Sequence, residues 1–350
     1  MRYSVDRLEM EGCRPGSIRA CRKPEPESFL NRRRLLLASA ATLIAGRAAA
    51  DTYPTRPIRF VVPFAAGAGI LDIMARVTGQ HLAEAAGQQI VVDNRPGAGG
   101  NVGADIVAKA TPDGYTMLMG NTAALVAPYL FAHMTFDPLV DLLPVTQVNS
   151  APLMLVVNPS LPVTSVKEFI AYAREKKGTL NYGSGGIGAT PFLAVELMKS
   201  MAGFDAVHVP YKGGSPALAA LVSGEISFMI ENVPGTLPFV RDNKLRALAV
   251  TSAQRLPLVG ELPTMQEAGV PGYEMVGWNG IYLPKNTPPE IVGKLHDLLA
   301  TVLQSDAMKK QMGDLGAVPV GNPQPEFAAF VKSESDRWGK IIREKGIKPE

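Results

Sequence analysis

The chain has 350 residues and a formal net charge of +3, yet ten of its 35 Lys and Arg residues and only five of its 32 Asp and Glu residues lie in positions 1–50. The rest of the chain therefore carries a formal charge of −2, a balance that gives no support to nucleic-acid binding. Both cysteines, Cys13 and Cys21, also lie in positions 1–50, which excludes thiol catalysis, disulfides and cysteine metal sites in the remainder.

The N-terminal segment has the pattern of an export signal. Three arginines at 32–34 precede an apolar, alanine-rich run that ends at Ala45, and the alanines at 48–50 supply a small-residue cleavage site. This run is shorter than the roughly 20 residues that span a membrane. Paired arginines before leucines favour twin-arginine export over the general secretory route, as does Arg47. We expect a periplasmic protein whose signal is cleaved near Ala50.

After the signal, short apolar strands alternate with helical segments, which predicts an α/β fold with a parallel-dominated sheet. The C-terminal third differs, because it predicts long amphipathic helices with few strands between them. The expected strands are 58–63, 90–92, 116–119, 145–148, 153–157, 180–182, 206–209, 226–230 and 245–250. The expected helices are 71–86, 102–110, 166–175, 190–201, 216–222, 237–241, 289–304, 306–315 and 325–345.

The stretch 91–120 is the most informative part of the chain. Arg95-Pro96-Gly97 ends a strand, and the glycines at 97–100 place bare backbone N–H groups before the helix expected at 102–110. Such a loop can host an anion or pack closely against a neighbouring segment. No catalytic side chain accompanies the glycines, so the pattern favours binding over chemistry.

Two further glycine loops follow predicted strands and precede predicted helices. The first contains Gly67 and Gly69, and the second, 182–190, contains four glycines with the hydroxyls of Ser184 and Thr190. Backbone N–H groups and the helix dipole at such positions attract an anion, although a tight βα turn would have the same pattern. Neither loop has the G-x-G-x-x-G spacing of a dinucleotide site.

Ser184 could also be a nucleophile, but Tyr182 stands where the G-x-S-x-G elbow needs glycine. No pair among the four histidines, at 81, 133, 208 and 296, has metal-ligand spacing, and we interpret each as structural. No nucleophile–base pair is evident from the sequence. Glu231 and Asn232 directly follow the strand expected at 226–230, where they would face a ligand crevice. Lys212 is either a surface charge or a second polar group at the same edge.

Several motifs in fixed order resemble those of the substrate-binding receptors of tripartite tricarboxylate transporters, the Bordetella uptake gene family. The resemblance covers residues 53–350. Its matching segments are YPTRPI at 53–58, PF at 63–64 with Asp72, NRPGAGGN at 94–101, PDGY at 112–115, HVPYKG at 208–213, LRALAVT at 245–251, PT at 263–264, Trp278, and TP at 287–288.

The resemblance implies a two-lobed fold like that of type II periplasmic binding proteins, with a small carboxylate held in the cleft between the lobes. Residues 1–50 would be the leader, 51–151 with 276–350 one lobe, and 152–275 the other, with hinges near 147–153 and 275–281. In the family, backbone amides and ordered waters from two loops hold the carboxylate. These two loops correspond here to 64–72 and 184–190. With the strand-end residues, the predicted ligand-binding residues are Phe64, Ala66, Gly67, Ala68, Gly69, Asp72, Asn121, Thr122, Ser184, Gly185, Gly186, Ala189, Thr190, Glu231, Asn232 and Trp278.

The sequence departs from the family pattern at both loops. The first loop is one residue longer and has Ile70-Leu71 before Asp72 instead of a hydroxyl residue. The second has Ala189 where Ser or Thr is usual and Phe192 where His is common. These changes favour a ligand with an apolar or aromatic body, or one that is not a dicarboxylate.

We therefore predict a monomeric solute receptor without enzymatic activity, cofactor or metal, working with the membrane subunits of a transporter. Two alternatives stay open at this point. One is a solute sensor that acts on a signalling protein, and the other is a hydrolase that uses the glycine loops.

Overall fold

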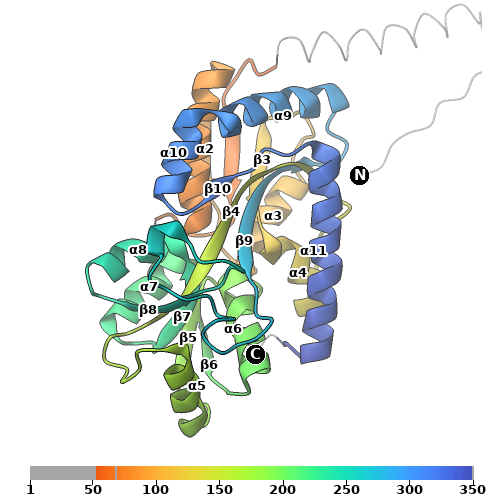
Figure 1. Ribbon diagram of the computed structural model, residues 1–350. Helices are drawn as coiled ribbons and strands as arrows, with labels where there is room; N and C mark the ends of the chain where they lie inside the picture. The colour runs from red at the N-terminus through yellow and green to blue at the C-terminus, as the bar shows by residue number, and fades with distance from the viewer. Residues whose placement is uncertain (1–52, 68, 349–350) are drawn as a thin grey trace, which may run out of the picture. The chain divides into compact units, whose positions relative to one another are not determined.

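The strands of the protein form one mixed sheet of ten strands in a computed structural model that describes residues 53–67 and 69–348 (Figure 1). The export signal expected in 1–50 lies outside these residues. The strand order is β2-β1-β3-β9-β4-β7-β5-β6, and β8 and β10 both pair with β4. The strands are β1 Ile58–Val62, β2 Ile90–Asn94, β3 Thr116–Gly120, β4 Leu142–Val157, β5 Asn181–Ser184, β6 Val207–Pro210, β7 Phe228–Asn232, β8 Arg246–Val250, β9 Val276–Pro284 and β10 Val318–Pro319.

Helices follow most strands and cover the sheet. The helices are α2 Ile70–Ala86, α3 Asn101–Ala108, α4 Thr122–Leu130, α5 Val166–Glu175, α6 Thr190–Ala202, α7 Gly214–Ser223, α8 Val233–Arg241, α9 Pro289–Gln304, α10 Asp306–Asp314 and α11 Gln324–Lys345, with short 3-10 turns at Ala98–Gly100 and Pro257–Val259. Five helices, α2, α4, α6, α7 and α8, start directly after a strand or after the loop that follows it. Their N-terminal ends lie where the two halves of the sheet meet, at the candidate site.

Most expected elements are present, and the bounds of α5 and α9 are those that the sequence predicted. One expectation was wrong, and two elements were not predicted. The strands expected at 145–148 and 153–157 are one continuous strand, β4, since its register shifts absorb the irregular stretch between them. The helix α4 was missed, because its interior Pro128 breaks the usual helical pattern. β9 was missed too, although its nine residues form a long strand.

The expectation of a parallel-dominated sheet holds only at the two ends of the sheet. β1 pairs in parallel with β2 and β3, and β5 pairs in parallel with β6 and β7. In the centre, β4 pairs only antiparallel, with β7, β8, β9 and β10. The reason is topological: β4 carries the chain out of one half of the sheet and β9 carries it back.

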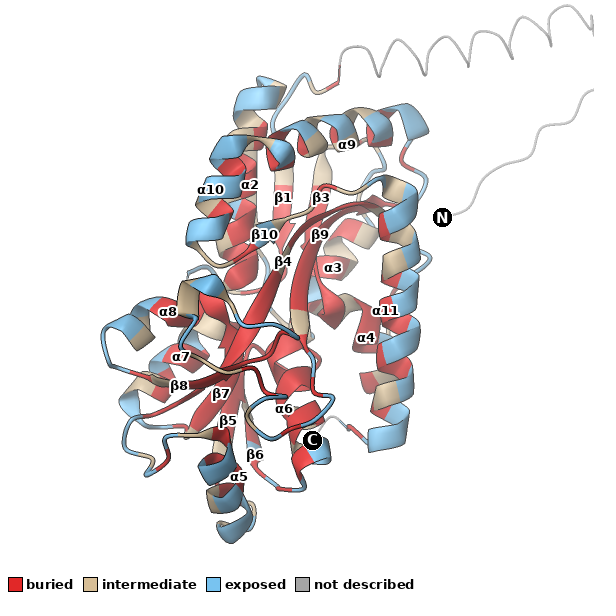
Figure 2. Ribbon diagram, in the orientation of Figure 1, coloured by how far each residue is buried: buried red, intermediate tan, exposed pale blue. Residues whose placement is uncertain are grey.

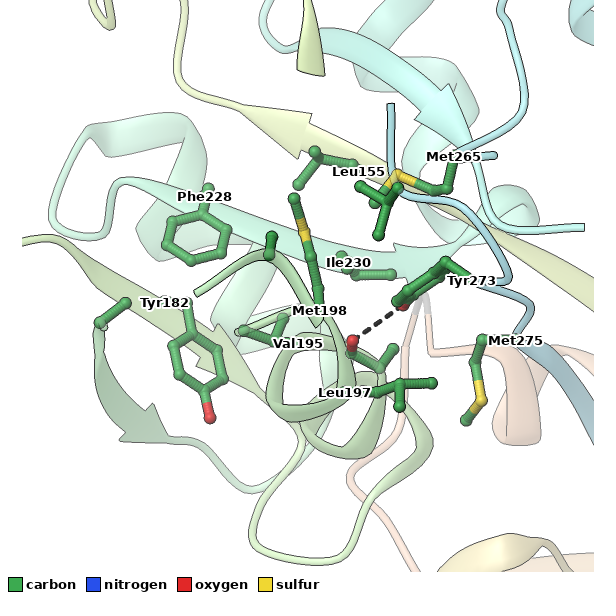
Figure 3. Close-up of a cluster of buried hydrophobic side chains, with 14 of the residues drawn as sticks. Leu155, Tyr182, Val195, Leu197, Met198, Phe228, Ile230, Met265, Tyr273 and Met275 are labelled. Carbon is green, nitrogen blue, oxygen red and sulfur yellow. Dashed lines mark hydrogen bonds between the residues drawn. The ribbon is translucent and has the colours of Figure 1, made fainter. Parts of the chain in front are cut away.

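Each half of the sheet has its own buried core, while the outward faces of its helices are exposed (Figure 2). The core around β1, β3 and α2 includes Phe60, Met74 and Leu295. The core around β5, β7 and α6 includes Phe228 and Tyr273, and the Tyr273 hydroxyl donates a 2.8 Å hydrogen bond to the Ala194 carbonyl (Figure 3). Burial of such large side chains is the main source of stability for both halves.

The C-terminal helix α11 packs on both halves (Figure 1). Near its start, Phe327 and Val331 belong to a core cluster with Leu118 of β3. Further along, Trp338 and Ile342 belong to the cluster of the other half, with α5 and α6. Within the described residues, no helix combines the length and apolar character needed to cross a membrane.

Candidate ligand site between the two halves of the sheet

A cavity lies where the two halves of the sheet face one another. It is lined by the loop before α2 and the first turn of that helix, by the N-terminal ends of α4, α6, α7 and α8, and by β9 at residues 277–279. Its volume is about 40 Å³. A space of this size holds only a few water molecules, so an organic acid would need the halves to separate in order to enter.

Five helix N-termini converge on this cavity. Four of these helices, α2, α6, α7 and α8, have no side-chain cap at their N-cap residues Gly69, Ala189, Gly213 and Asn232. The first N–H groups of a helix have no partner within the helix, and the helix dipole makes this end positive. None of the described residues that line the cavity is Lys, Arg or His. An anion bound here would therefore be held by neutral backbone donors.

Asp72 fixes the first glycine loop from the first turn of α2. Its carboxylate accepts hydrogen bonds from Gly67 N at 3.0 Å, from Arg76 at 2.9 and 3.0 Å, and from Asn94 at 2.9 Å. Asn94 in turn donates to the Phe64 carbonyl at 3.0 Å. Burial alone raises the pKa of Asp72, but these hydrogen bonds and the Arg76 charge outweigh burial and hold that pKa below its ordinary value. Asp72 is thus an ionised carboxylate that orders the loop.

Glu231, at the end of β7, is the second carboxyl group at the cavity, and only 4% of it is exposed. Its Oε1 accepts hydrogen bonds from Asn232 N at 2.8 Å and Asn232 Nδ2 at 2.7 Å. Burial raises the pKa of Glu231 above its ordinary value, although the Asn232 hydrogen bonds act in the opposite direction. The two carboxyl groups of the cavity therefore differ in their tendency to ionise.

The second glycine loop is ordered by a pair that the sequence did not reveal. Ser184 Oγ shares a 2.7 Å hydrogen bond with His208 Nε2 and accepts another from Gly186 N at 3.1 Å. No serine–histidine pair was evident from the sequence, because the two residues are 24 positions apart and only the parallel pairing of β5 with β6 brings them together. Burial, with a smaller effect of Lys199, lowers the pKa of His208 to about 4, so the ring is neutral near pH 7.

This serine does not have the position of a nucleophile. Ser184 is fully buried, and it does not line the cavity. The ring of His208 lies between two aromatic rings, stacked on Tyr182 at 4.9 Å and tilted against Phe192 at 4.8 Å. The interpretation of His208 as a structural histidine agrees with these contacts. Phe192, which was expected to make the pocket more apolar, instead packs in this core.

The two halves touch on the cavity side through backbone atoms of glycine-rich loops. Ala65 N donates a 3.0 Å hydrogen bond to the Lys212 carbonyl. Gly99, in the loop 97–101, lies so close to the Ile187 carbonyl that a Cβ on this glycine would come within 2.2 Å of the oxygen. The loop 97–101, for which the sequence allowed either anion binding or close packing, thus packs closely and does not line the cavity.

The structure brings most of the predicted site residues to the cavity, and ligand contact stays a prediction for all of them. Ala68 lies outside the described residues. Those beside the cavity, without lining it, are Ala66, Gly67, Thr122, Ser184 and Gly186. Those that line it are Phe64, Gly69, Asp72, Asn121, Gly185, Ala189, Thr190, Glu231, Asn232 and Trp278.

Seven other lining residues were not predicted. Ala65, Ile70, Leu71 and Pro191 directly adjoin predicted residues, so widening both loops would have included them. Gly277 and Asn279 flank the predicted Trp278, and Gly214 adjoins no predicted residue.

Trp278 links the cavity to α11. It lines the cavity from β9, and its indole Nε1 donates a 3.1 Å hydrogen bond to Glu334 Oε2 on α11. Trp338 Nε1 donates to the same oxygen at 3.3 Å. One carboxylate oxygen therefore serves the two tryptophans of the chain.

Comparison with known proteins agrees with this geometry. The model of the tripartite tricarboxylate transporter family receptor matches residues 74–347. Protein BugT of Bordetella pertussis is 38% identical over 307 residues, which cover 87% of this chain and 94% of BugT. The chain belongs to this receptor family.

Solved structures of similar proteins have the same fold. Rpa4515 of R. palustris, described with adipate, is 39% identical with a TM-score of 0.82, covering 85% of this chain and 100% of its own. MatC from Rhodopseudomonas palustris, with bound malate, is 32% identical with a TM-score of 0.79, covering 83% and 100%. The fold is thus the two-lobed α/β fold of periplasmic binding proteins, as the sequence predicted, and the family consists of solute receptors of transporters.

Proposed function

We propose that this protein is a periplasmic receptor that binds a small carboxylate in the cavity between its lobes and delivers it to the membrane subunits of a tripartite tricarboxylate transporter. The observation that carries the proposal is the convergence of five helix N-termini on a cavity without Lys, Arg or His among its described lining residues. Neutral N–H donors at positive helix ends suit a carboxylate, and the similar proteins Rpa4515 and MatC have been solved with adipate and with malate.

The lobes are proposed as 51–151 with 276–350, and 152–275. The crossing points near 147–153 and 275–281 lie in β4 and β9, which pair with each other there, Asn149 with Asn279 and Ala151 with Gly277. A bulge in β4 between Gln147 and Asn149 interrupts the ladder next to this point. Bending at the bulge would let the lobes move as two bodies about the paired strands.

The proposal includes binding without chemistry. It is supported by the burial of Ser184 and by its position outside the cavity lining, which leave its hydroxyl out of reach of a bound solute. Export through the N-terminal signal, cleaved near Ala50, and a monomeric state are part of the same proposal. No nucleic acid or cofactor is involved.

Binding, closure and lack of turnover are tested together on the exported protein. We expect adipate, malate or another small carboxylate to raise the midpoint of thermal unfolding, as a ligand that binds only the native state must. We expect small-angle scattering to show a smaller radius of gyration with ligand. We expect the NMR spectrum of the ligand to be unchanged after incubation with the protein. Stabilisation by no carboxylate in a broad panel, or conversion of the ligand that depends on Ser184, would contradict the proposal.

A second experiment separates transport from sensing. Deletion of the gene should abolish uptake of the radiolabelled ligand, and a copy of the gene should restore uptake. Unchanged uptake together with loss of a ligand-dependent transcriptional response would favour a signalling partner instead.

A further inference from the structure

Glu231 has one carboxyl oxygen that is satisfied and one that is not. Oε1 accepts both hydrogen bonds from Asn232, whereas Oε2 is buried and has no partner among the described residues. Oε2 lies against the first residue of α7, since a Cβ on Gly214 would be 2.9 Å from it. Both Glu231 and Gly214 line the cavity. A buried polar atom without a partner costs free energy, so this oxygen requires a proton, a water or a ligand atom.

Among the described residues, no cationic side chain forms an ion pair with Glu231. Its neighbour across the sheet on β4 is Met154, and residue 277 of β9 is glycine. Helix α7 has no charged residue, and the one charged residue of α8, Arg241, lies in its last turn. His208, on β6, is neutral near pH 7 because its pKa is about 4.

The other titratable group among the described lining residues is Asp72, which is negative and whose charge is matched by Arg76. A carboxylate that enters the cavity would therefore add a further negative charge beside Glu231. Two carboxyl groups that share a site do not both ionise, because repulsion raises the pKa of one of them. The burial that already raises the pKa of Glu231 acts in the same direction.

We propose, on the basis of the carboxylate-receptor function above, that Glu231 binds the ligand as a neutral acid: its Oε2 carries a proton and donates a hydrogen bond to a carboxylate oxygen of the ligand. The proton comes from solvent, so binding takes up one proton. The ligand class this selects has two acceptor ends, one at the helix N-termini and one at Glu231. Apolar Ile70 and Leu71, which also line the cavity, suit a hydrocarbon body between them.

The direction of the pH effect follows from the two states of Glu231. In the open, hydrated cleft its pKa is closer to the ordinary value, and in the closed complex it is raised. The complex therefore binds more protons than the free protein, and affinity is highest below the pKa of the free state. As pH rises from there towards the pKa of the complex, affinity falls by about tenfold per pH unit for one proton taken up.

Calorimetric titration with adipate and with malate, from pH 6 to pH 8 in two buffers of different ionisation enthalpy, measures this proton directly. We expect wild type to take up close to one proton and to lose affinity with rising pH. Glu231→Gln keeps the shape and the donor, so we expect it to bind with no proton uptake and a flat pH profile. Glu261→Gln, an exposed glutamate in the same lobe, is the matched control and should behave like wild type.

Three results would overturn the proposal. If wild type takes up no proton on binding, Glu231 does not become protonated when the ligand binds. This result is obtained on wild type alone and does not depend on the folding of a variant. Loss of binding by Glu231→Gln, with tight binding of glutamate by wild type, would mean that an anionic Glu231 holds a ligand ammonium group. If wild type binds no carboxylate at all, the receptor function itself fails, which distinguishes that failure from the failure of the Glu231 role alone.

Discussion

The two lobes meet on the cavity side and again along α11, and the contacts on these two sides differ in kind. On the cavity side they are backbone contacts of small residues, such as the Ala65 N–H to the Lys212 carbonyl and Gly99 against the Ile187 carbonyl. Along α11 they are large buried side chains: Trp338 is fully buried in the core of the second lobe, and Phe327 in a core of the first.

This difference predicts which side opens. Glycine loops bury few apolar atoms, so water can replace their contacts at little cost in free energy. Separating Trp338 and Ile342 from their core would expose large apolar surfaces. We therefore expect the cavity side to open while α11 and the paired strands β4 and β9 stay in contact. Changes on the α11 side should affect stability, and changes on the cavity side should affect ligand affinity.

The largest effect is expected from Glu334→Ala on α11. This change removes the acceptor of two buried indole N–H groups, those of Trp278 and Trp338. Two unsatisfied buried donors should lower the free energy of unfolding by about 2–4 kcal/mol, as measured by urea denaturation. Glu334→Gln keeps an oxygen acceptor, so its free energy of unfolding should fall clearly less. Equal stability of wild type and Glu334→Ala would show that α11 does not hold the lobes together through this carboxylate.

A matched pair of glycines tests the cavity side. Gly99 and Gly87 have nearly the same left-handed backbone, with φ of 64° and 63°, but a Cβ on Gly87 would meet nothing within 4 Å. Alanine at either position should therefore cost about 1 kcal/mol of stability through backbone strain. Only Gly99→Ala also clashes with the Ile187 carbonyl, so we expect it to weaken ligand binding by about tenfold or more, with Gly87→Ala at wild-type affinity. Equal affinity of the two variants would show that the close approach of Gly99 to the Ile187 carbonyl is not needed for the bound, closed form.

The smallest effect is expected from Lys212→Ala. The side chain of Lys212 is exposed, and its contribution to the contact between lobes is the backbone carbonyl, which alanine keeps. We expect less than about a threefold change in affinity. We also expect wild-type affinity to depend weakly on salt, because no described residue that lines the cavity is a cation whose attraction to the ligand could be screened. If Lys212→Ala abolishes binding, the ligand is held by an ion pair with the Lys212 side chain and not by backbone donors.

The sequence predicted those features that depend on local pattern. Glycines that follow strands predicted the loops, and the amphipathic periodicity predicted the bounds of α5 and α9. Most lining residues predicted for the cavity lie in these loops or at strand ends, as at Thr190 and Glu231. Features that depend on strand order were not predictable, because no local pattern records which strands become neighbours. The pairing of Ser184 with His208 is one such feature, since it needs β5 beside β6.

The strand β9 illustrates the same limit. Its sequence, VGWNGIYLP, places Gly277, Trp278 and Asn279 at the cavity, but neither the length of the strand nor its antiparallel partner β4 could be read from it. The wide use of glycine here is explained only by the packing: a Cβ on Gly280 would come within 2.2 Å of the Phe327 ring. Tertiary contact, not local propensity, decides this segment.

Because Trp278 and Trp338 share one hydrogen-bond acceptor beside the cavity, tryptophan fluorescence can report on the state of this region. The chain has two tryptophans, and both indoles lie within hydrogen-bonding distance of one carboxylate oxygen of Glu334. Indole emission is sensitive to a nearby charge and to hydration, and one of these indoles borders the cavity that a solute would fill. All tryptophan fluorescence of the molecule thus originates at the junction between the ligand cavity and α11.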